Sequence, residues 1–420
     1  RLAEQGYRIG VVAPRCAARP VVATGSARAG LGGSCRVAEG AAPLGTPRQL
    51  AHLAAATASP SEQGGTLLAG AAAVVAGLGA VLLGTAAEMS PAAEPYLDPP
   101  ISPDLRERLS DPEDWQARME DLVLRRQAEI VGALSEIDGG AKFRVDRYER
   151  PNGDGGGITT VLQDSDVFEK AGVNISVIRG DLKPQLAKQM SARGKDLGPG
   201  PHRFFASGIS SVVHPRNPHV PTMHFNYRYF ECTASNGKRT WWYGGGTDLT
   251  PYFLNEPDVV HFHQTLKDTC DKHDPAYYPE YKKWCDDYFL IKHRNERRGV
   301  GGVFFDDLDN KRQEELFAFV SDMSATVLPC YAPMVLANKD RSYSDTDRDW
   351  QLLRRGRYVE YNLVYDRGTK FGLATPQARI ESIFISLPLF ARWEYKHEIV
   401  PGTPEDEITK VLKEPREWVK

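Results

Sequence analysis

One stretch, from residue 224 to 251, constrains the fold more than any other part of the chain. Aromatic and polar residues alternate along its first half, so His224, Asn226 and Arg228 fall on one face of a strand and three aromatic rings on the other. The pair Asn236-Gly237 can supply the positive φ angles of a tight turn, and Arg239 begins the returning strand. The sequence therefore predicts a β-hairpin with one polar face.

The end of this hairpin carries a run of three glycines, 244–246, followed by Asp248. Residues without a β-carbon let a flat ligand approach the backbone, with a carboxylate at its edge. A histidine, an amide and a guanidinium on a rigid sheet, opposite that aspartate, are typical of a preorganised site for an anionic ligand that contains nitrogen. The plainer interpretation, a solvated face with a few polar residues, stays open.

Further strands precede the hairpin. Alternating segments are predicted at 143–148, 158–163, 173–179 and 204–214. Because the connections between them are mostly short, the strands should form an antiparallel sheet. The glycine-rich segment 153–157 lacks the endings of a phosphate-binding loop and is interpreted as a turn.

Helical patterns surround this run of strands. Helices are predicted at 111–137, 182–191, 256–272, 277–298, 314–327 and 350–355, the first with Asp111 as cap and Pro112 in its first turn. Two more strands are predicted at 299–307 and 357–365, and 376–388 suits either a helix or a strand. His261 and His263 point in different directions on a helix, which disfavours a paired metal site.

The N-terminal part does not resemble a folded domain. Residues 1–87 contain seven arginines, no lysine and three glutamates, the composition of a mitochondrial presequence, predicted to occupy 1–88; a disordered tail is the alternative. The uncharged stretch at about 66–87 is marginally long enough to cross a bilayer. It suits a sorting signal that is cut to release the protein into the intermembrane space, although a retained anchor also fits. Residues 89–111 are interpreted as a linker or arm, and 112–420 as one catalytic domain.

Charge and cysteine content exclude several classes of function. The balance of charge is mildly acidic beyond residue 88, which argues against a nucleic acid partner. Four cysteines remain there, Cys232, Cys270, Cys285 and Cys330, without the close spacing of a zinc site or a disulfide framework. They are interpreted as buried thiols.

The run from Lys282 to Asp306, with Lys282-x-Trp284-Cys285 and His293-Arg294-x-Glu296-x-Arg298-Gly299, resembles the signature of oxygen-dependent coproporphyrinogen III oxidases. The resemblance extends over about 112–420 and includes 208–215, the hairpin and 354–372. It implies an α+β fold, a large curved antiparallel sheet flanked by helices on both faces, and a homodimer. It also implies a reaction: two propionates of coproporphyrinogen III become vinyl groups, giving protoporphyrinogen IX, CO2 and hydrogen peroxide in haem biosynthesis. O2 is then the co-substrate, and neither a metal nor an organic cofactor is needed.

The resemblance also assigns site residues. His224 matches the family's acid, Asp248 the aspartate placed under the pyrrole nitrogens, and Arg228 completes the expected catalytic set. Expected substrate-binding positions are Ser210, Asn226, Tyr227, Arg228, Gln377, Ala378 and Arg379. The last three correspond to the family's usual Gly-Ser-Arg: Gln377 and Ala378 differ from it, and only Arg379 is retained. A second departure is Leu290, which stands where an aromatic residue is common.

These expectations agree with the chemistry of the residues. An electron-rich porphyrinogen can itself reduce O2, so the protein has to orient it and handle protons. Asp248 could accept hydrogen bonds from converging pyrrole N–H groups, while Arg228 and Arg379 could bind propionates. Two alternatives stay open: a non-haem iron oxygenase using His261, His263 and Asp248, and a tetrapyrrole carrier without catalysis. A mitochondrial intermembrane-space location and a peripheral association with the inner membrane are also expected.

Overall fold

The computed structural model describes residues 101–420, except 151–152, 193 and 375–377. The predicted presequence with its sorting segment, most of the predicted arm, and Gln377 therefore lie outside the described residues. The described part of the arm contains helix α2 (Pro103–Arg108), which buries Leu105 and whose Arg108 pairs with Asp114.

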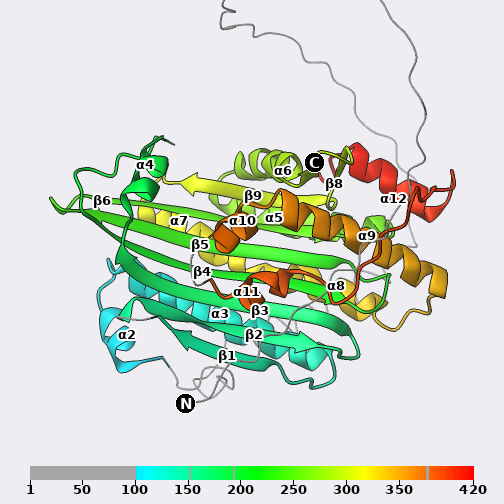
Figure 1. Ribbon diagram of the computed structural model, residues 1–420, viewed down its shortest axis with the longest axis horizontal. Coiled ribbons are helices and arrows are strands. Elements are labelled where there is room, and N and C mark those ends of the chain that lie inside the picture. Colours follow the sequence, from blue (N-terminus) through cyan, green and yellow to red (C-terminus); the bar gives the residue numbers. More distant parts are fainter. Residues whose placement is uncertain (1–100, 151–152, 193, 375–377) are drawn as a thin grey trace, which may run out of the picture. The chain divides into compact units, whose positions relative to one another are not determined.

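A seven-stranded sheet forms the centre of the fold, in the order β1-β2-β3-β4-β5-β6-β9 (Figure 1). Its strands are β1 (Arg144–Glu149), β2 (Gly155–Gln163), β3 (Phe168–Asp181), β4 (His202–Pro215), β5 (Thr222–Ala234), β6 (Arg239–Thr250) and β9 (Gly301–Leu308). Every neighbouring pair is antiparallel, which confirms the predicted sheet. Two short strands, β7 (Leu290–Ile291) and β8 (Glu296–Arg297), form a separate hairpin.

Helices cover both faces of this curved sheet, which confirms the predicted α+β class. They are α3 (Trp115–Ile137), α4 (Pro184–Ala192), α5 (Glu256–His273), α6 (Tyr277–Tyr288), α7 (Gln313–Ala325), α8 (Val327–Asn338), α9 (Asp345–Val364), α10 (Arg367–Ala374), α11 (Ile380–Ile383) with the 3-10 turn η2 (Phe384–Ser386), and α12 (Pro404–Lys413). In Figure 1, α9, α10 and α11 run in front of the sheet, while α3, α7 and α8 lie behind it. We call these the front and back faces.

The alternation in β5 separates the core from the front face. Phe225, Tyr227 and Tyr229 are at most 1% exposed and belong to the main hydrophobic cluster on the back face. The residues between them, including His224 and Arg228, are only partly buried. Burial of each large ring stabilises the fold by roughly 1.5–3 kcal/mol, because its apolar surface is removed from water. The predicted polar face of the hairpin is therefore confirmed, and its register is held by the core beneath it.

The hairpin is also confirmed, but of the predicted pair Asn236-Gly237 only Gly237 has a positive φ, and the glycine run does not end the strand. Gly237 has a φ of 81°, and the backbone N–H of Ala234 donates to the carbonyl of Lys238 over 2.9 Å. Beyond it, β6 continues through the glycines to Thr250. A β-carbon at Gly246 would lie 2.5 Å from the Val303 carbonyl oxygen, because β9 approaches closely. The glycines are thus required by neighbouring protein atoms.

The predicted strand at 357–365 was wrong, because the segment belongs to helix α9, whereas the helix predicted at 350–355 is confirmed but forms only part of that longer helix. Ser344 and Asp347 form a capping box that begins this helix. Tyr358, Tyr361 and Asn362 are buried at helical spacing against the front face. A strong start signal and tertiary packing thus outweigh an aromatic and β-branched pattern that favours a strand.

The ends of other helices and strands differ from the predicted ones, because helix caps and chain turns determine where each element begins and ends. Helix α3 begins at Trp115 with Asp114 as its cap, not at Asp111. The helix predicted at 277–298 ends at Tyr288, since the chain turns there into the β7–β8 hairpin. Residues 155–157 lie in β2 instead of a turn, and α8 was not predicted as a separate helix. The stretch Gln313–Asn338 is long and apolar enough to cross a membrane, yet 61% of its most apolar window is buried inside the protein.

Candidate active site

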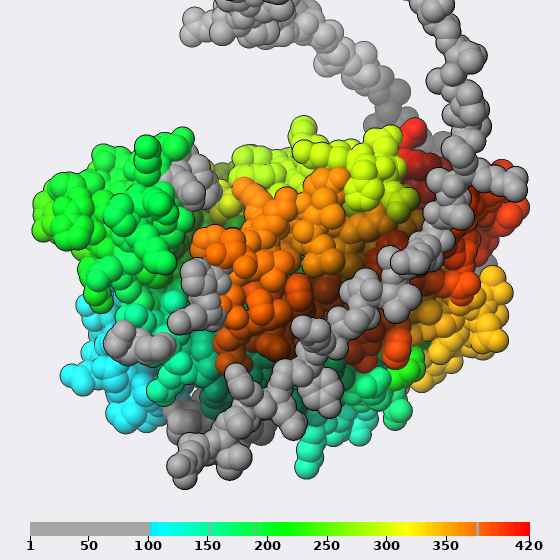
Figure 2. Space-filling model, in the orientation of Figure 1, coloured from blue at the N-terminus to red at the C-terminus, as the bar shows by residue number. Residues whose placement is uncertain are grey.

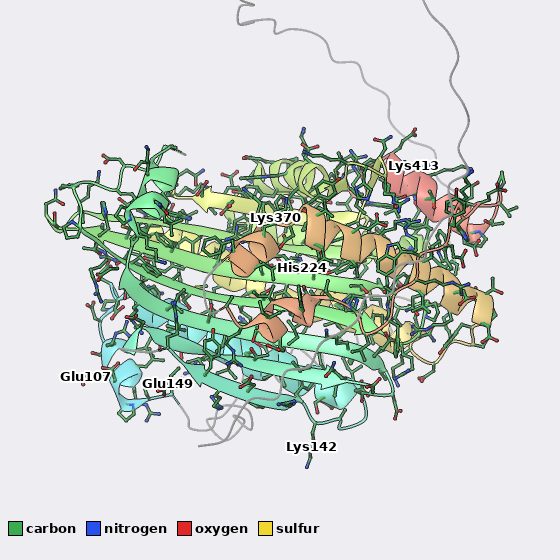
Figure 3. The ribbon with its side chains drawn as sticks, viewed as in Figure 1. Glu107, Lys142, Glu149, His224, Lys370 and Lys413 are labelled. Carbon is green, nitrogen blue, oxygen red and sulfur yellow. The ribbon has the colours of Figure 1, made fainter. Side chains whose placement is uncertain are left out.

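The front face of the sheet brings together residues predicted from separate parts of the chain. His224 on β5 lies directly opposite Asp248 on β6, and Asn226 lies between Gly246 and Ser210 of the neighbouring strands. Arg228 likewise lies between Gly208 and Gly244, so small residues flank the side chains of β5. His224 lies on the central strands, on the face along which α9 to α11 run (Figure 3).

A hydrogen-bonded chain of three side chains forms the centre of the site. His224 Nδ1 lies 2.6 Å from Asp248 Oδ1. Arg298 Nη2 donates to both carboxylate oxygens over 2.9 and 2.8 Å. Asp248 and Arg298 are 2% and 3% exposed. With Nδ1–H donating to the carboxylate, the other ring nitrogen of His224, Nε2, is left to exchange protons with a ligand.

Electrostatic interactions keep Asp248 and Arg298 charged. Burial alone would raise the pKa of Asp248, but the Arg298 guanidinium and the His224 ring hold it below its usual value. Burial alone would lower the pKa of Arg298, but the adjacent carboxylate raises it. The guanidinium lies 4.0 Å from the ring centroid of Phe289 and 4.5 Å from that of Tyr358, and its Nη1 donates to Asn362 Oδ1 over 2.8 Å. The ion pair is therefore a rigid support under His224.

This geometry bears on the role expected for Asp248. Both of its oxygens are already occupied by donors from His224 and Arg298. Its side chain is almost completely covered. The arrangement therefore favours a role in orienting His224 over direct contact with the N–H groups of a ligand.

Two arginines next to this chain share one carboxylate. Arg228 Nη2 lies 2.9 Å from Asp306 Oδ1, and Arg367 Nη2 lies 3.7 Å from Asp306 Oδ2. Burial alone would raise the pKa of Asp306, but the two guanidinium groups lower it. The arginine side chains remain 40% and 56% exposed, and Arg228 also donates to Asn226 Oδ1. The cluster has a net positive charge and accessible donors, which suits a ligand carboxylate.

The remaining predicted residues lie in different surroundings. Tyr227 is fully buried on the back face, where its hydroxyl is 2.6 Å from Thr247 Oγ1, so its side chain does not reach the front. Ser210 is exposed on β4. Ala378 is partly buried, and Arg379, at the start of α11, pairs with Asp146 on β1.

The segment 380–388, which we call the strap, is fixed to the front face mainly through its backbone. Lys170 Nζ donates to the carbonyls of Phe384 and Leu387 over 3.0 and 2.7 Å. His214 Nε2 lies 3.0 Å from the carbonyl of Ser386. Burial lowers the pKa of Lys170 to about 8. Side chains of α9 to α11 cover the middle of this face (Figure 2).

The ligand set of the iron oxygenase alternative is not assembled. His263 is buried between the Tyr278 hydroxyl and the Val300 carbonyl, at 2.9 and 3.2 Å, and burial lowers its pKa to about 3. His261 Nε2 lies 3.0 Å from the Pro329 carbonyl. In the part of the chain that the structure describes, no group of three or more His, Cys, Asp and Glu side chains is arranged to hold a metal ion. The four predicted buried thiols are confirmed.

Comparison with known proteins places this arrangement in a family. The sequence model described as coproporphyrinogen III oxidase matches residues 118–418. The chain belongs to the coproporphyrinogen III oxidase family. An oxygen-dependent coproporphyrinogen-III oxidase of Drosophila melanogaster is 61% identical over 326 residues, which cover 77% of this chain and 83% of that protein. The mitochondrial enzyme of Homo sapiens is 55% identical over 335 residues, covering 79% of this chain and 73% of that protein. Coproporphyrinogen-III oxidase 1 of Arabidopsis thaliana, named chloroplastic, is 52% identical over 308 residues, covering 72% and 79%.

Sequence reasoning missed several residues of the candidate site. Arg298 and Asp306 were noted only as residues of the family signature, and Arg367 only as part of the matching segment 354–372. Their charge could have indicated that they belong to ion pairs, because a buried or shared carboxylate needs a cationic partner. Their positions depend on contacts between distant parts of the chain, which no local pattern encodes.

Replacement of Gly244 tests the arginine cluster of this oxidase. A β-carbon there would lie 2.7 Å from both Arg228 Nη2 and Asp306 Oδ1. Gly244→Ala should therefore displace the ion pair and raise KM about tenfold, the loss typical of one charged hydrogen bond. Steady-state kinetics would measure it, with Gly132→Ala as control, because nothing lies within 4 Å of a β-carbon at that position. Unchanged KM would show that the arginines bind no substrate group.

A carboxylate beside α9 predicts a dependence of stability on pH. Glu360 accepts hydrogen bonds from His293, Arg294, Arg357 and Trp393. Burial alone would raise its pKa, but the bonds from Arg294 and His293 lower it from 4.5 to about 2. Because the folded-state pKa is depressed, this stabilisation is complete above pH 4.5 and is lost as the pH falls towards about 2.

Urea unfolding across that pH range should show the effect. The wild type should lose more free energy of unfolding than Glu360→Gln, which lacks the titrating group. Equal losses in the two proteins would contradict the assignment.

Proposed function

We propose that this chain catalyses the O2-dependent oxidative decarboxylation of two propionate side chains of coproporphyrinogen III to vinyl groups, giving protoporphyrinogen IX in haem biosynthesis. The observation that carries the proposal is the His224–Asp248–Arg298 chain beside the paired arginines 228 and 367. It combines one group that exchanges protons with two that bind carboxylates, on the family's fold.

Each of the two decarboxylations balances with O2 and one proton as the only other reactants. A propionate loses CO2 from its carboxylate and a hydrogen with an electron pair from the carbon next to the pyrrole ring, which leaves a vinyl group. The two electrons reduce O2, and one further proton completes hydrogen peroxide. The side chain supplies both electrons and the electron-rich pyrrole next to it assists their removal, so O2 acts as co-substrate, and we propose that neither a metal nor an organic cofactor takes part.

The residues have distinct proposed roles. His224 exchanges a proton through Nε2, while Asp248 fixes the ring and stabilises its charged form. Arg228, with Asn226 beside it, and Arg379 bind peripheral carboxylates, and Ser210 on the adjoining strand contributes a hydroxyl. Tyr227 contributes only backbone on the front face, and Gln377 and Ala378 adjoin Arg379.

An assay of metal-stripped protein with coproporphyrinogen III tests the function. In air, two molecules each of CO2 and hydrogen peroxide should form per substrate; without O2, none should. A requirement for stoichiometric iron would favour the oxygenase alternative. Binding of porphyrinogen without release of CO2 would make the protein a carrier.

The arrangement in the cell is part of the proposal. We propose a homodimer in the mitochondrial intermembrane space, with residues 1–88 as the presequence and a peripheral contact with the inner membrane. The arginine-rich, lysine-free composition of that segment and the mitochondrial naming of the human, rat and mouse relatives support it. Sedimentation tests the dimer. A reporter fused to residues 1–88 should enter mitochondria, and removal of these residues should leave activity intact; cytosolic retention of the reporter would contradict the targeting.

A further inference from the structure

A straight row of side chains crosses the front face from the edge strand to the candidate centre. Successive cross-strand partners are Asp146, Thr159, Asn174, Ser210 and Asn226, one from each of β1 to β5. The three in the middle are neutral hydroxyl or amide side chains. Four steps of about 4.8 Å between strands separate the ends by roughly 19 Å along the sheet. The two ends are therefore about as far apart as opposite side chains of a tetrapyrrole, and the strap contacts the middle of the row at Thr159 and Asn174.

A second cationic group lies at the edge-strand end of this row. Arg379 forms an ion pair with Asp146 and lies over the ring of Tyr148, 4.5 Å from its centroid. Arg379 is the N-cap residue of α11, and its Nε lies 3.4 Å from Ser382 Oγ. The same helix is attached to the row, because Ser382 Oγ is 3.2 Å from Thr159 Oγ1. The arginine is therefore held above the row, with its charge already matched by a carboxylate.

The two ends of the row differ in how firmly that carboxylate is held. At the β5 end, Asp306 is 12% exposed and lies between two arginines. At the β1 end, Asp146 is 45% exposed and Arg379 39% exposed. Exposed ion pairs are weak, because water and salt compete for both partners. A ligand carboxylate could replace Asp146 on Arg379 at little cost, whereas Asp306 is much harder to replace.

We propose that Asp146 is a specificity-determining residue that occupies Arg379 until a carboxylate of the substrate takes its place. The inference rests on the proposed function and adds a residue to which no role has been assigned. A ligand that carries a carboxylate at this end exchanges it for Asp146 and gains the arginine. A ligand without one leaves the ion pair intact and gains nothing there.

Binding of coproporphyrin III, the fully oxidised macrocycle with the same four carboxylates, tests the proposal without turnover. Its Kd is measured by quenching of porphyrin fluorescence in the wild type, Asp146→Asn, Arg379→Ala and the double variant. Asp146→Asn should lower Kd about two- to fivefold, the range of an exposed ion pair, and Arg379→Ala should raise it. In the double variant, the benefit of Asp146→Asn should disappear. For the tetramethyl ester of coproporphyrin III, which carries no carboxylate, Asp146→Asn should leave Kd unchanged.

Asp181→Asn is the matched control, because Asp181 is also exposed on the sheet and pairs with one arginine, Arg203. It should leave every Kd unchanged. If Asp146→Asn raises Kd as Arg379→Ala does, Asp146 only orients the arginine and the proposal is wrong. If Arg379→Ala weakens binding while Asp146→Asn has no effect, this inference fails and the proposed function stands. If neither matters, the role of Arg379 in the proposed function fails as well.

Discussion

Asp248→Asn is expected to reduce kcat at least about 10²-fold, the range seen when one preorganised electrostatic group is removed. An amide at this position lacks the charge that stabilises a protonated His224 ring, now 2.6 Å from the carboxylate. The same substitution leaves Arg298, only 3% exposed, without its counter-charge. The melting temperature should therefore fall too, by an amount that corresponds to roughly 3–5 kcal/mol. Steady-state kinetics and thermal unfolding measure the two effects.

Two further variants separate catalysis from stability. His224→Gln removes the proton-exchanging ring but keeps the Asp248–Arg298 pair, so it should lose turnover with a smaller loss of stability. Replacing both members of the pair, with Asp248→Asn and Arg298→Met, removes the unpaired charge and should regain part of the stability but none of the turnover. Near-normal kcat in Asp248→Asn would rule out the role assigned to this carboxylate.

Glu169→Gln is expected to lower the free energy of unfolding by about 3–5 kcal/mol, because it leaves the buried Arg355 without its charged partner. Glu169 is fully buried and forms ion pairs with Arg355 and Arg348. Arg355, 1% exposed, also donates to the Pro215 carbonyl over 2.6 Å and so connects α9 to the end of β4. Equilibrium unfolding in urea measures the loss.

Asp287→Asn provides the matched control for this second prediction. Asp287 also pairs with a cation, Lys283, but their side chains are 60% and 76% exposed. Its replacement should change stability by no more than about 0.5 kcal/mol. A loss below about 1 kcal/mol for Glu169→Gln would mean that water reaches Arg355, contrary to its burial.

Local patterns were sufficient to predict the hairpin and its two faces. The alternation along β5 has a period of two, and Asn236-Gly237 is a turn signal contained in two residues. The sequence 357–365 carries a similar alternation and yet is helical. The difference lies in context: β5 has a strand on each side, whereas 357–365 continues a helix that is capped at Ser344 and packs on the front face. Single-segment patterns do not contain that information.

The same limit applies to the candidate site. His224 and Arg228 could be placed on one face, and Asp248 opposite, because all three belong to one hairpin. The engagement of Asp248 by Arg298 could not be predicted, because Arg298 follows 50 residues later in the chain. The pairing of Arg379 with Asp146 spans 233 residues. Charge identifies such residues as needing partners, but only the folded chain determines which partners they find.

The attachment of the strap affects how this region can vary among relatives. Three of its contacts with the sheet use carbonyl oxygens, at Phe384, Ser386 and Leu387, which every amino acid possesses. Substitutions at these three positions would leave the acceptors in place, so mutational tolerance should be higher there than at Ile385 between them, which is 7% exposed. The donors, Lys170 and His214, are side chains with no equivalent replacement. The residues that fix the position of the strap should thus vary least at Lys170 in β3 and His214 in β4, which are far from the strap in the sequence.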